Sequence, residues 1–215
     1  MVNSFKISIK QAIFVIFSIT VLLFLSLTLL TQYYFSQKII EESTKTIIEK
    51  ISENISTRLE INEERVKNGI NLIELFREEK VDIKEGELHP STEKMAIFMA
   101  NNPFTLALYY GYRNGNFFEV INLNIDSGVE SKIIKKENEA WLVIKIIEKD
   151  GKRVKIEEYL DDRFNLLRSE KIENNNFEPI NRPWYNLAIK NDKIIKTAPY
   201  LFDNIKSLGI TYAKK

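Results

Sequence analysis

The stretch Gln11–Gln37, QAIFVIFSITVLLFLSLTLLTQYYFSQ, constrains everything that follows it. Its 27 residues contain no charged side chain between Lys10 and Lys38. As a helix it would reach roughly 40 Å, enough to cross a hydrocarbon core of about 30 Å. Tyr33 and Tyr34 suit the membrane interface, where a ring lies among acyl chains and its hydroxyl meets water. We predict a transmembrane helix over residues 11–37.

A cleaved signal peptide and a buried core helix are the alternatives for this stretch. Its apolar core is longer than the about 7–15 residues usual in a signal peptide, and Gln32–Phe35 follow it instead of a small-x-small cleavage site. A core helix rarely has so long an uninterrupted apolar run. An uncleaved anchor is therefore favoured. Basic residues are nearly balanced on its two sides, so charge alone leaves the orientation open.

The composition excludes several classes of function. Lys and Arg number 31 against 30 Asp and Glu, so no one-signed surface for nucleic acid is expected. The absence of cysteine excludes thiol catalysis, cysteine metal sites and disulfides. The single histidine, His89, lies beside Pro90, and we expect a solvent-exposed loop residue there. One histidine cannot form a histidine-rich metal site or a histidine-based phosphodiesterase, and neither a metal nor a cofactor is expected.

Residues 38–80 are expected to form a stalk helix, because they contain no proline and one glycine, Gly69. Apolar residues recur along one face at steps of three and four. They are Ile40, Ile47, Ile48, Ile51, Ile55, Leu59, Val66, Ile70, Ile73 and Phe76. About half of this stripe lies close to the membrane, which favours a parallel homodimer through residues 39–60. A helix docked wholly on its own domain is the alternative.

A β-hairpin is predicted from Thr105–Arg113 and Asn116–Asn124, joined by Asn114-Gly115. This pair favours a type I′ turn, which needs positive φ at both residues. A short helix, Thr92–Asn101, is predicted before the hairpin, with Ser91 as its cap.

A second hairpin is predicted from Trp141–Lys149 and Lys152–Tyr159, joined by Asp150-Gly151. Further elements are expected at Arg163–Ser169 (strand), Trp184–Lys190 (helix opened by Pro183), Ile194–Tyr200 and Gly209–Ala213 (strands). Long helix, antiparallel hairpins and short helices together predict an α+β fold. Residues 81–215 are expected to form one module, a PAS-like five-stranded antiparallel sheet with helices and a pocket on one face.

The anchor, the stalk, the hairpin LALYYGYRNGNFFEVINLN and the later NRPWYNLA, TAPYLFDN and GITYA segments resemble double Cache sensor domains of bacterial transmembrane receptors. The resemblance covers residues 10–215. It implies that residues 1–10 are cytoplasmic and that the anchor lies in the inner membrane. The sensor module would be periplasmic, would be the membrane-distal one of the two Cache modules, and would be incomplete at its C-terminus. Such receptors carry HD-GYP, diguanylate cyclase or adenylate cyclase output domains. None is present here, so the chain itself is expected not to be an enzyme.

The pattern of Arg182, Trp184, Tyr185 and Tyr200 resembles a pattern that lines the ligand pocket in many Cache domains. An arginine can bind a carboxylate through two parallel hydrogen bonds, and the aromatic side chains can wall the ligand. Phe177 stands where amino-acid-binding members have a tyrosine, which removes one hydroxyl. These five residues are the predicted ligand contacts.

Other interpretations stay open at this point. Arg182 can be a surface ion-pair partner, and Trp184 and Tyr185 can be core residues. The acid that would pair with a ligand ammonium lies later in the family's domain, and Asp203 does not match it cleanly. The ligand can thus be an amino acid, a simple organic acid, an amine or none. A structural anchor that dimerises is the alternative function, whereas no nucleophile, paired acids or phosphate loop supports an enzyme.

Overall fold

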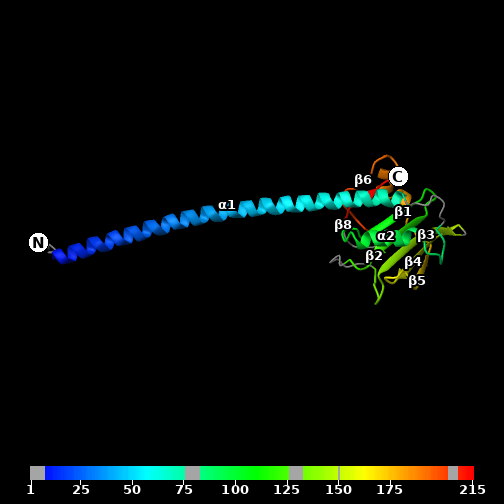
Figure 1. Cartoon of the computed structure of the whole chain (residues 1–215), viewed down its shortest axis with the longest axis horizontal. Helices are drawn as coiled ribbons and strands as arrows, with labels where there is room; N and C mark the ends of the chain where they lie inside the picture. Colours follow the sequence, from blue (N-terminus) through cyan, green and yellow to red (C-terminus); the bar gives the residue numbers. More distant parts are fainter. Residues whose placement is uncertain (1–7, 76–82, 126–132, 150, 203–207) are drawn as a thin grey trace. The chain divides into compact units, whose positions relative to one another are not determined.

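The computed structural model describes residues 8–75, 83–125, 133–149, 151–202 and 208–215. The chain divides into two compact units, Met1–Leu59 and Glu60–Lys215. The described part of the first unit is helical from Ile9, and the second unit contains the sheets (Figure 1).

Helix α1 (Ile9–Leu75) is continuous over 67 residues. Its apolar part, with a mean hydropathy of 2.8, is long and apolar enough to cross a membrane. The hydroxyls of Thr20, Thr28 and Thr31 donate to the carbonyls of Ile16, Phe24 and Leu27, so each bonds within the helix, as a lipid environment requires. The predicted stalk is helical to Leu75, and its last five residues lie outside the described part of the chain.

The second unit is built on a five-stranded antiparallel sheet whose strand order follows the sequence, β1-β2-β3-β4-β5. The strands are β1 (Ala107–Gly111), β2 (Phe117–Asn122), β3 (Trp141–Lys149), β4 (Lys152–Leu160) and β5 (Leu166–Glu173). Both predicted hairpins are confirmed by the β1–β2 and β3–β4 pairing. The α+β fold is therefore confirmed. Strand β5 begins three residues later than predicted and continues four residues further.

The first hairpin turn is not of type I′. Gly115 has φ +83°, whereas Asn114 is not among the residues with positive φ. Tyr112 accepts from the Gly115 N–H over 3.0 Å and donates to Asn116 over 2.9 Å, which makes a three-residue loop with only the glycine left-handed. The Asn114 side chain accepts from the Asn116 N–H and so stabilises this loop instead. Asp150 of the second turn lies outside the described residues.

Short elements complete the unit: α2 (Ser91–Ala100), the 3-10 turn η1 (Pro179–Asn181), α3 (Pro183–Ala188), β6 (Ile195–Lys196), β7 (Tyr200–Leu201), β8 (Leu208–Gly209) and β9 (Tyr212–Ala213). Ser91 does not cap α2, because it lies within the helix and the capping position is Pro90. Each of the two predicted C-terminal strands is split, with β6 pairing β9 and β7 pairing β8. Pro199, which lacks an N–H, interrupts the first of them.

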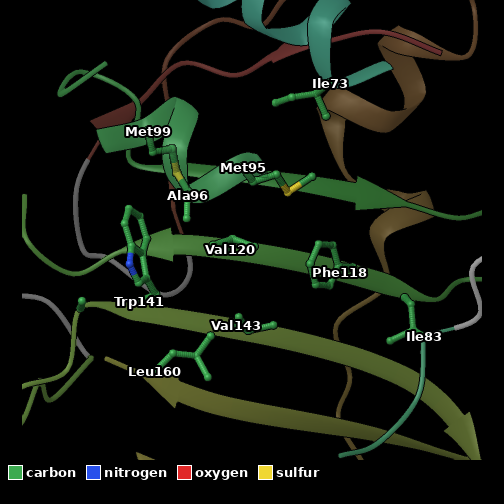
Figure 2. Close-up of a cluster of buried hydrophobic side chains, with 11 residues drawn as sticks. Ile73, Ile83, Met95, Ala96, Met99, Phe118, Val120, Trp141, Val143 and Leu160 are labelled. Atoms are coloured by element: carbon green, nitrogen blue, oxygen red, sulfur yellow. The ribbon is translucent and has the colours of Figure 1, made fainter. Parts of the chain in front are cut away.

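One face of the sheet is covered by α2. Figure 2 shows Met95, Ala96 and Met99 of α2 above the strand that carries Phe118 and Val120. All five residues are fully buried. The opposite face of the sheet packs against α3, through Trp184. Helices therefore lie on both faces, and the cleft described below takes lining residues from α3 and from both faces of β1.

His89 is not the exposed loop residue that the sequence suggested. It is buried, its ring centroid lies 4.2 Å from that of Phe118, and its Nδ1 accepts from the Ser91 N–H. Burial, with the nearby charge of Lys145, lowers the pKa of His89 to about 4. The imidazole is therefore a neutral part of the core at physiological pH.

Candidate functional site

All five predicted ligand contacts line one cleft in the second unit. Phe177, Arg182, Trp184, Tyr185 and Tyr200 reach it from the η1–α3 segment and from β7. Its volume is about 1530 Å³, above the ~300–1,000 Å³ typical of small-molecule pockets. A smaller cavity of about 320 Å³ lies against the sheet and shares Phe177 and Arg182 with the cleft. A small solute would thus fill one part of this space.

Arg182 is held by the backbone on both sides. Its N–H donates to Pro179 over 3.0 Å, and its carbonyl accepts from the Asn186 N–H over 3.1 Å. The guanidinium carbon lies 4.4 Å from the centre of the Phe177 ring. This distance is within the range of a cation–π contact, so Phe177 positions the arginine although it lacks the family's hydroxyl. The side chain is half-buried and not a freely solvated surface group.

Trp184 serves as core and as cleft wall. It is buried, with its ring centroid 4.8 Å from that of Tyr109 on β1. A Cβ at Gly111 would lie 2.5 Å from the indole, so β1 can pass the ring only with glycine at this position. Tyr185 lies edge-on to the indole and is half-buried. The core interpretation of Trp184 is therefore correct, and it is compatible with a place in the cleft.

Tyr200 is positioned by hydroxyl groups that the sequence analysis did not identify. The Tyr200 and Thr211 hydroxyls lie 2.7 Å apart, and the Tyr109 hydroxyl donates to Thr211 over 2.9 Å. Burial raises the pKa of Tyr109 well above its usual value, with Tyr200 adding to the effect, so the phenol stays a neutral donor. Thr211 in turn is held by Thr197, whose hydroxyl accepts the Thr211 N–H over 3.0 Å.

Glu119 of β2 also lines the cleft and the smaller cavity, and it too was missed. It is paired with Tyr109 on β1 and Ile144 on β3, and its side chain is 9 % exposed. Burial raises the pKa of Glu119 to about 7, Lys155 opposes this shift, and Glu157 adds to it. The alternation of FFEVIN would have placed this carboxyl on the face of Phe117 and Ile121.

The cleft is joined to the last turns of α1 by polar contacts of β6 and β9. Glu63 accepts from Lys196 over 2.5 Å, from Lys67 over 2.7 Å and from Tyr212 over 3.0 Å. Together, led by Lys196, they lower the pKa of Glu63 to about 2. Lys214 donates to Glu74 over 2.6 Å. These contacts lie within the second unit and connect a cleft-lining strand to the helix.

The sequence also raised Asp203 as a possible ligand contact and gave no expectation of a metal site. Asp203 lies outside the described residues. Within the part of the chain that the structure describes, three or more His, Asp or Glu side chains do not gather into a potential metal site.

Comparison with known proteins shows a similarity to an adenylate cyclase. Neither a protein-family model nor a solved structure matches the chain. The chain is 26 % identical over 127 residues to Adenylate cyclase 1 of Rhizobium meliloti (strain 1021). The match covers 57 % of this chain and 19 % of that protein, so the chain spans about a fifth of its relative. This similarity and the apolar N-terminal helix fit a membrane signalling protein.

Proposed function

We propose that this chain is the extracytoplasmic input of a bacterial membrane signalling protein, a Cache-type sensor that binds a small carboxylate. The observation that carries the proposal is the placement of Arg182 and four aromatic side chains on one cleft. Four of these residues come from the segment 177–185 and Tyr200 comes from β7, and their place on one cleft supports a site more than any one of them does.

The chemistry of the cleft suits an anion. The guanidinium of Arg182 lies half-buried over the Phe177 ring, where a bidentate bond to a carboxylate is stronger than in bulk water. Trp184 and Tyr185 supply flat apolar walls. The Tyr200 hydroxyl, held at Thr211, is within the same cleft and can accept or donate a hydrogen bond.

Signal transmission would use the β9 contacts with α1. Thr211 touches Tyr200 in the cleft, and the next residue, Tyr212, donates to Glu63 of the helix. A ligand that favours one position of β9 would therefore bias the contacts of residues 60–75 of α1. The size of that bias equals the ligand's difference in affinity for the two arrangements.

The rest of the proposal concerns topology and output. The N-terminal helix would anchor the sensor in the inner membrane with residues 1–10 in the cytoplasm and the second unit in the periplasm. The similarity to Adenylate cyclase 1 supports a cyclic-nucleotide output in a full-length protein. Homodimerisation through residues 39–60 would bring two outputs together.

A ligand screen by thermal shift on the full chain in nanodiscs tests this function. A carboxylate that raises the melting temperature should lose most of its effect in Arg182→Ala. Arg163→Ala, which changes an exposed arginine outside the cleft, is the matched control and should leave the effect unchanged. Equal binding to the Arg182→Ala protein would show that the arginine has no part in recognition.

A membrane-anchored dimerisation module without a ligand is the second candidate. It is favoured by the apolar stripe of α1, where Ile48, Ile51 and Ile55 are 61 %, 53 % and 52 % exposed. A stripe of this kind is covered when two helices pair. The two candidates differ in the screen above, since a module of this second kind would show no carboxylate-dependent shift.

A further inference from the structure

Glu119 is a buried carboxyl without a hydrogen bond or ion pair among the residues that the structure describes. It lies in β2, in the middle of the sheet, and its side chain borders both the cleft and the smaller cavity. Neighbouring positions on this face, Phe117 and Ile121, are apolar core residues. A carboxyl in such a place is costly unless something bonds to it.

The groups that face Glu119 are bonded elsewhere or are apolar, so they do not donate a hydrogen bond to its carboxyl group. On β4, Lys155 is engaged with Glu157, with 2.6 Å between Nζ and the carboxylate, and both side chains are about 15 % exposed or less. On β1, the Tyr109 hydroxyl donates to Thr211. The partner in β3 is the apolar Ile144.

The smaller cavity brings Glu119 to the predicted anion contact. Its lining includes Glu119, Lys155 and Arg182, together with Asn175, Asn176 and Phe177. A volume of about 320 Å³ falls within the range of small-molecule sites. A ligand in this cavity would therefore meet a cationic group and an unsatisfied acceptor at the same time.

We propose that Glu119 is a second ligand contact, and that the space beside Phe177 and Arg182, where the cleft and the smaller cavity share their lining, takes a small carboxylic acid that also carries a hydrogen-bond donor, either an ammonium or a hydroxyl group. The carboxylate binds Arg182 and the donor binds Glu119. This inference rests on the proposed carboxylate-sensing function and narrows the class of ligand. Simple monocarboxylates would leave Glu119 unsatisfied and bind more weakly.

The ionisation of Glu119 would allow an experiment to distinguish an ammonium donor on the ligand from a hydroxyl donor. Because its pKa is raised to about 7, the carboxyl is partly protonated at neutral pH. An ammonium group needs the ionised form, so its binding would release a proton near pH 6.5. A hydroxyl group can donate to the ionised form or accept from the protonated form, and its affinity would depend less on pH.

Matched triplets of acids test the proposal on the full chain in nanodiscs. Propionate, lactate and alanine share a three-carbon frame, and 3-phenylpropionate, 3-phenyllactate and phenylalanine form an aromatic set. In each set, we expect either the hydroxy acid or the amino acid to bind at least about tenfold more tightly than the acid without a donor group. Calorimetry at pH 6.5 in buffers of different ionisation enthalpy would detect the released proton.

Two variants of Glu119 identify the donor. Glu119→Gln removes the charge but keeps an acceptor, whereas Glu119→Leu removes both. An ammonium preference should disappear in both variants, and a hydroxyl preference should disappear only in Glu119→Leu, while the simple acid stays within about twofold of its original affinity. Glu173→Gln, an exposed glutamate of β5, is the control and should change none of the three affinities.

The outcomes separate this inference from the function on which it rests. If acids bind through Arg182 but the members of a triplet bind equally, or if both Glu119 variants keep the preference, the role of Glu119 is overturned and carboxylate sensing stands. If none of the six acids binds the unaltered protein, both are overturned.

Discussion

The hydroxyl of Tyr212 donates to the carboxylate of Glu63 over 3.0 Å, although 149 residues separate the two in the chain. Tyr212 belongs to β9, whose preceding residue, Thr211, touches Tyr200 in the cleft. Glu63 belongs to the helix that continues from the apolar N-terminal segment. This contact links the candidate ligand site to the helix whose N-terminal part is long and apolar enough to cross a membrane.

Replacing Glu63 by Gln should loosen β6 and β9. The substitution removes the carboxylate that Lys196, Lys67 and Tyr212 share, so amide hydrogens of Ile195–Lys196 and Tyr212–Ala213 should exchange faster. Hydrogen exchange with mass spectrometry measures this effect. Glu64→Gln, at the adjacent exposed position, is the control. Unchanged exchange in the Glu63 variant would show that these contacts do not hold the strands.

The stability of Glu119→Gln should depend on pH. Burial raises the folded-state pKa of Glu119 to about 7, so between about pH 4.5 and pH 7 the folded chain holds a proton that the unfolded chain has lost. The free energy of unfolding therefore falls as pH rises through this window. Relative to the unaltered protein, Glu119→Gln should gain about 1–3 kcal/mol between pH 4 and pH 8. Urea unfolding checks this, and a difference independent of pH would contradict it.

His89 should titrate far below the usual histidine range. Its pKa is lowered to about 4 by burial and by the charge of Lys145, so it resists protonation in the folded state. Between about pH 6.5 and pH 4 the unfolded chain binds a proton at His89 and the folded chain does not. The free energy of unfolding therefore decreases as pH falls through this window. Because the chain has one histidine, its NMR ring signals report this pKa directly. A midpoint near 6.5 would show an exposed imidazole.

Cysteines placed on the α1 stripe should cross-link in the membrane. The chain has no cysteine, so Ile48→Cys and Ile55→Cys each carry a single thiol. In a parallel dimer through residues 39–60, oxidation should give a disulfide-linked dimer on a denaturing gel. Glu53→Cys, which lies off the stripe, is the control and should react less. Equal yields at all three positions would indicate random collision instead of pairing.

Local patterns predicted most of the fold. The apolar run and the steps of three and four along α1 gave the long helix, and the Asn-Gly and Asp-Gly pairs gave both hairpins, because each of these signals lies within a few residues. The type of the first turn was wrong, since the side chain of Asn114 bonds to the backbone and leaves the left-handed position to Gly115. Long-range packing buried His89 against Phe118, which no local pattern indicated.

The candidate site was predicted in part. Arg182, Trp184, Tyr185, Tyr200 and Phe177 line one cleft, and their role as ligand contacts stays a prediction. Tyr109, Glu119 and Thr211 were missed because their roles depend on which strands become neighbours. The alternation in β2 could have placed Glu119 inward, but only its register with Tyr109 on β1 and Ile144 on β3 shows that neither neighbouring strand supplies an ion-pair partner among the described residues.

Carboxylate binding by the full chain, measured by titration calorimetry in nanodiscs for the unaltered protein, Arg182→Lys and Arg182→Ala, tests the central claim most directly. The account predicts saturable binding that weakens about tenfold or more in Arg182→Lys, which keeps the charge but loses the planar donor fork, and that is abolished in Arg182→Ala. Affinities that are the same in all three proteins would contradict a sensor site built on Arg182.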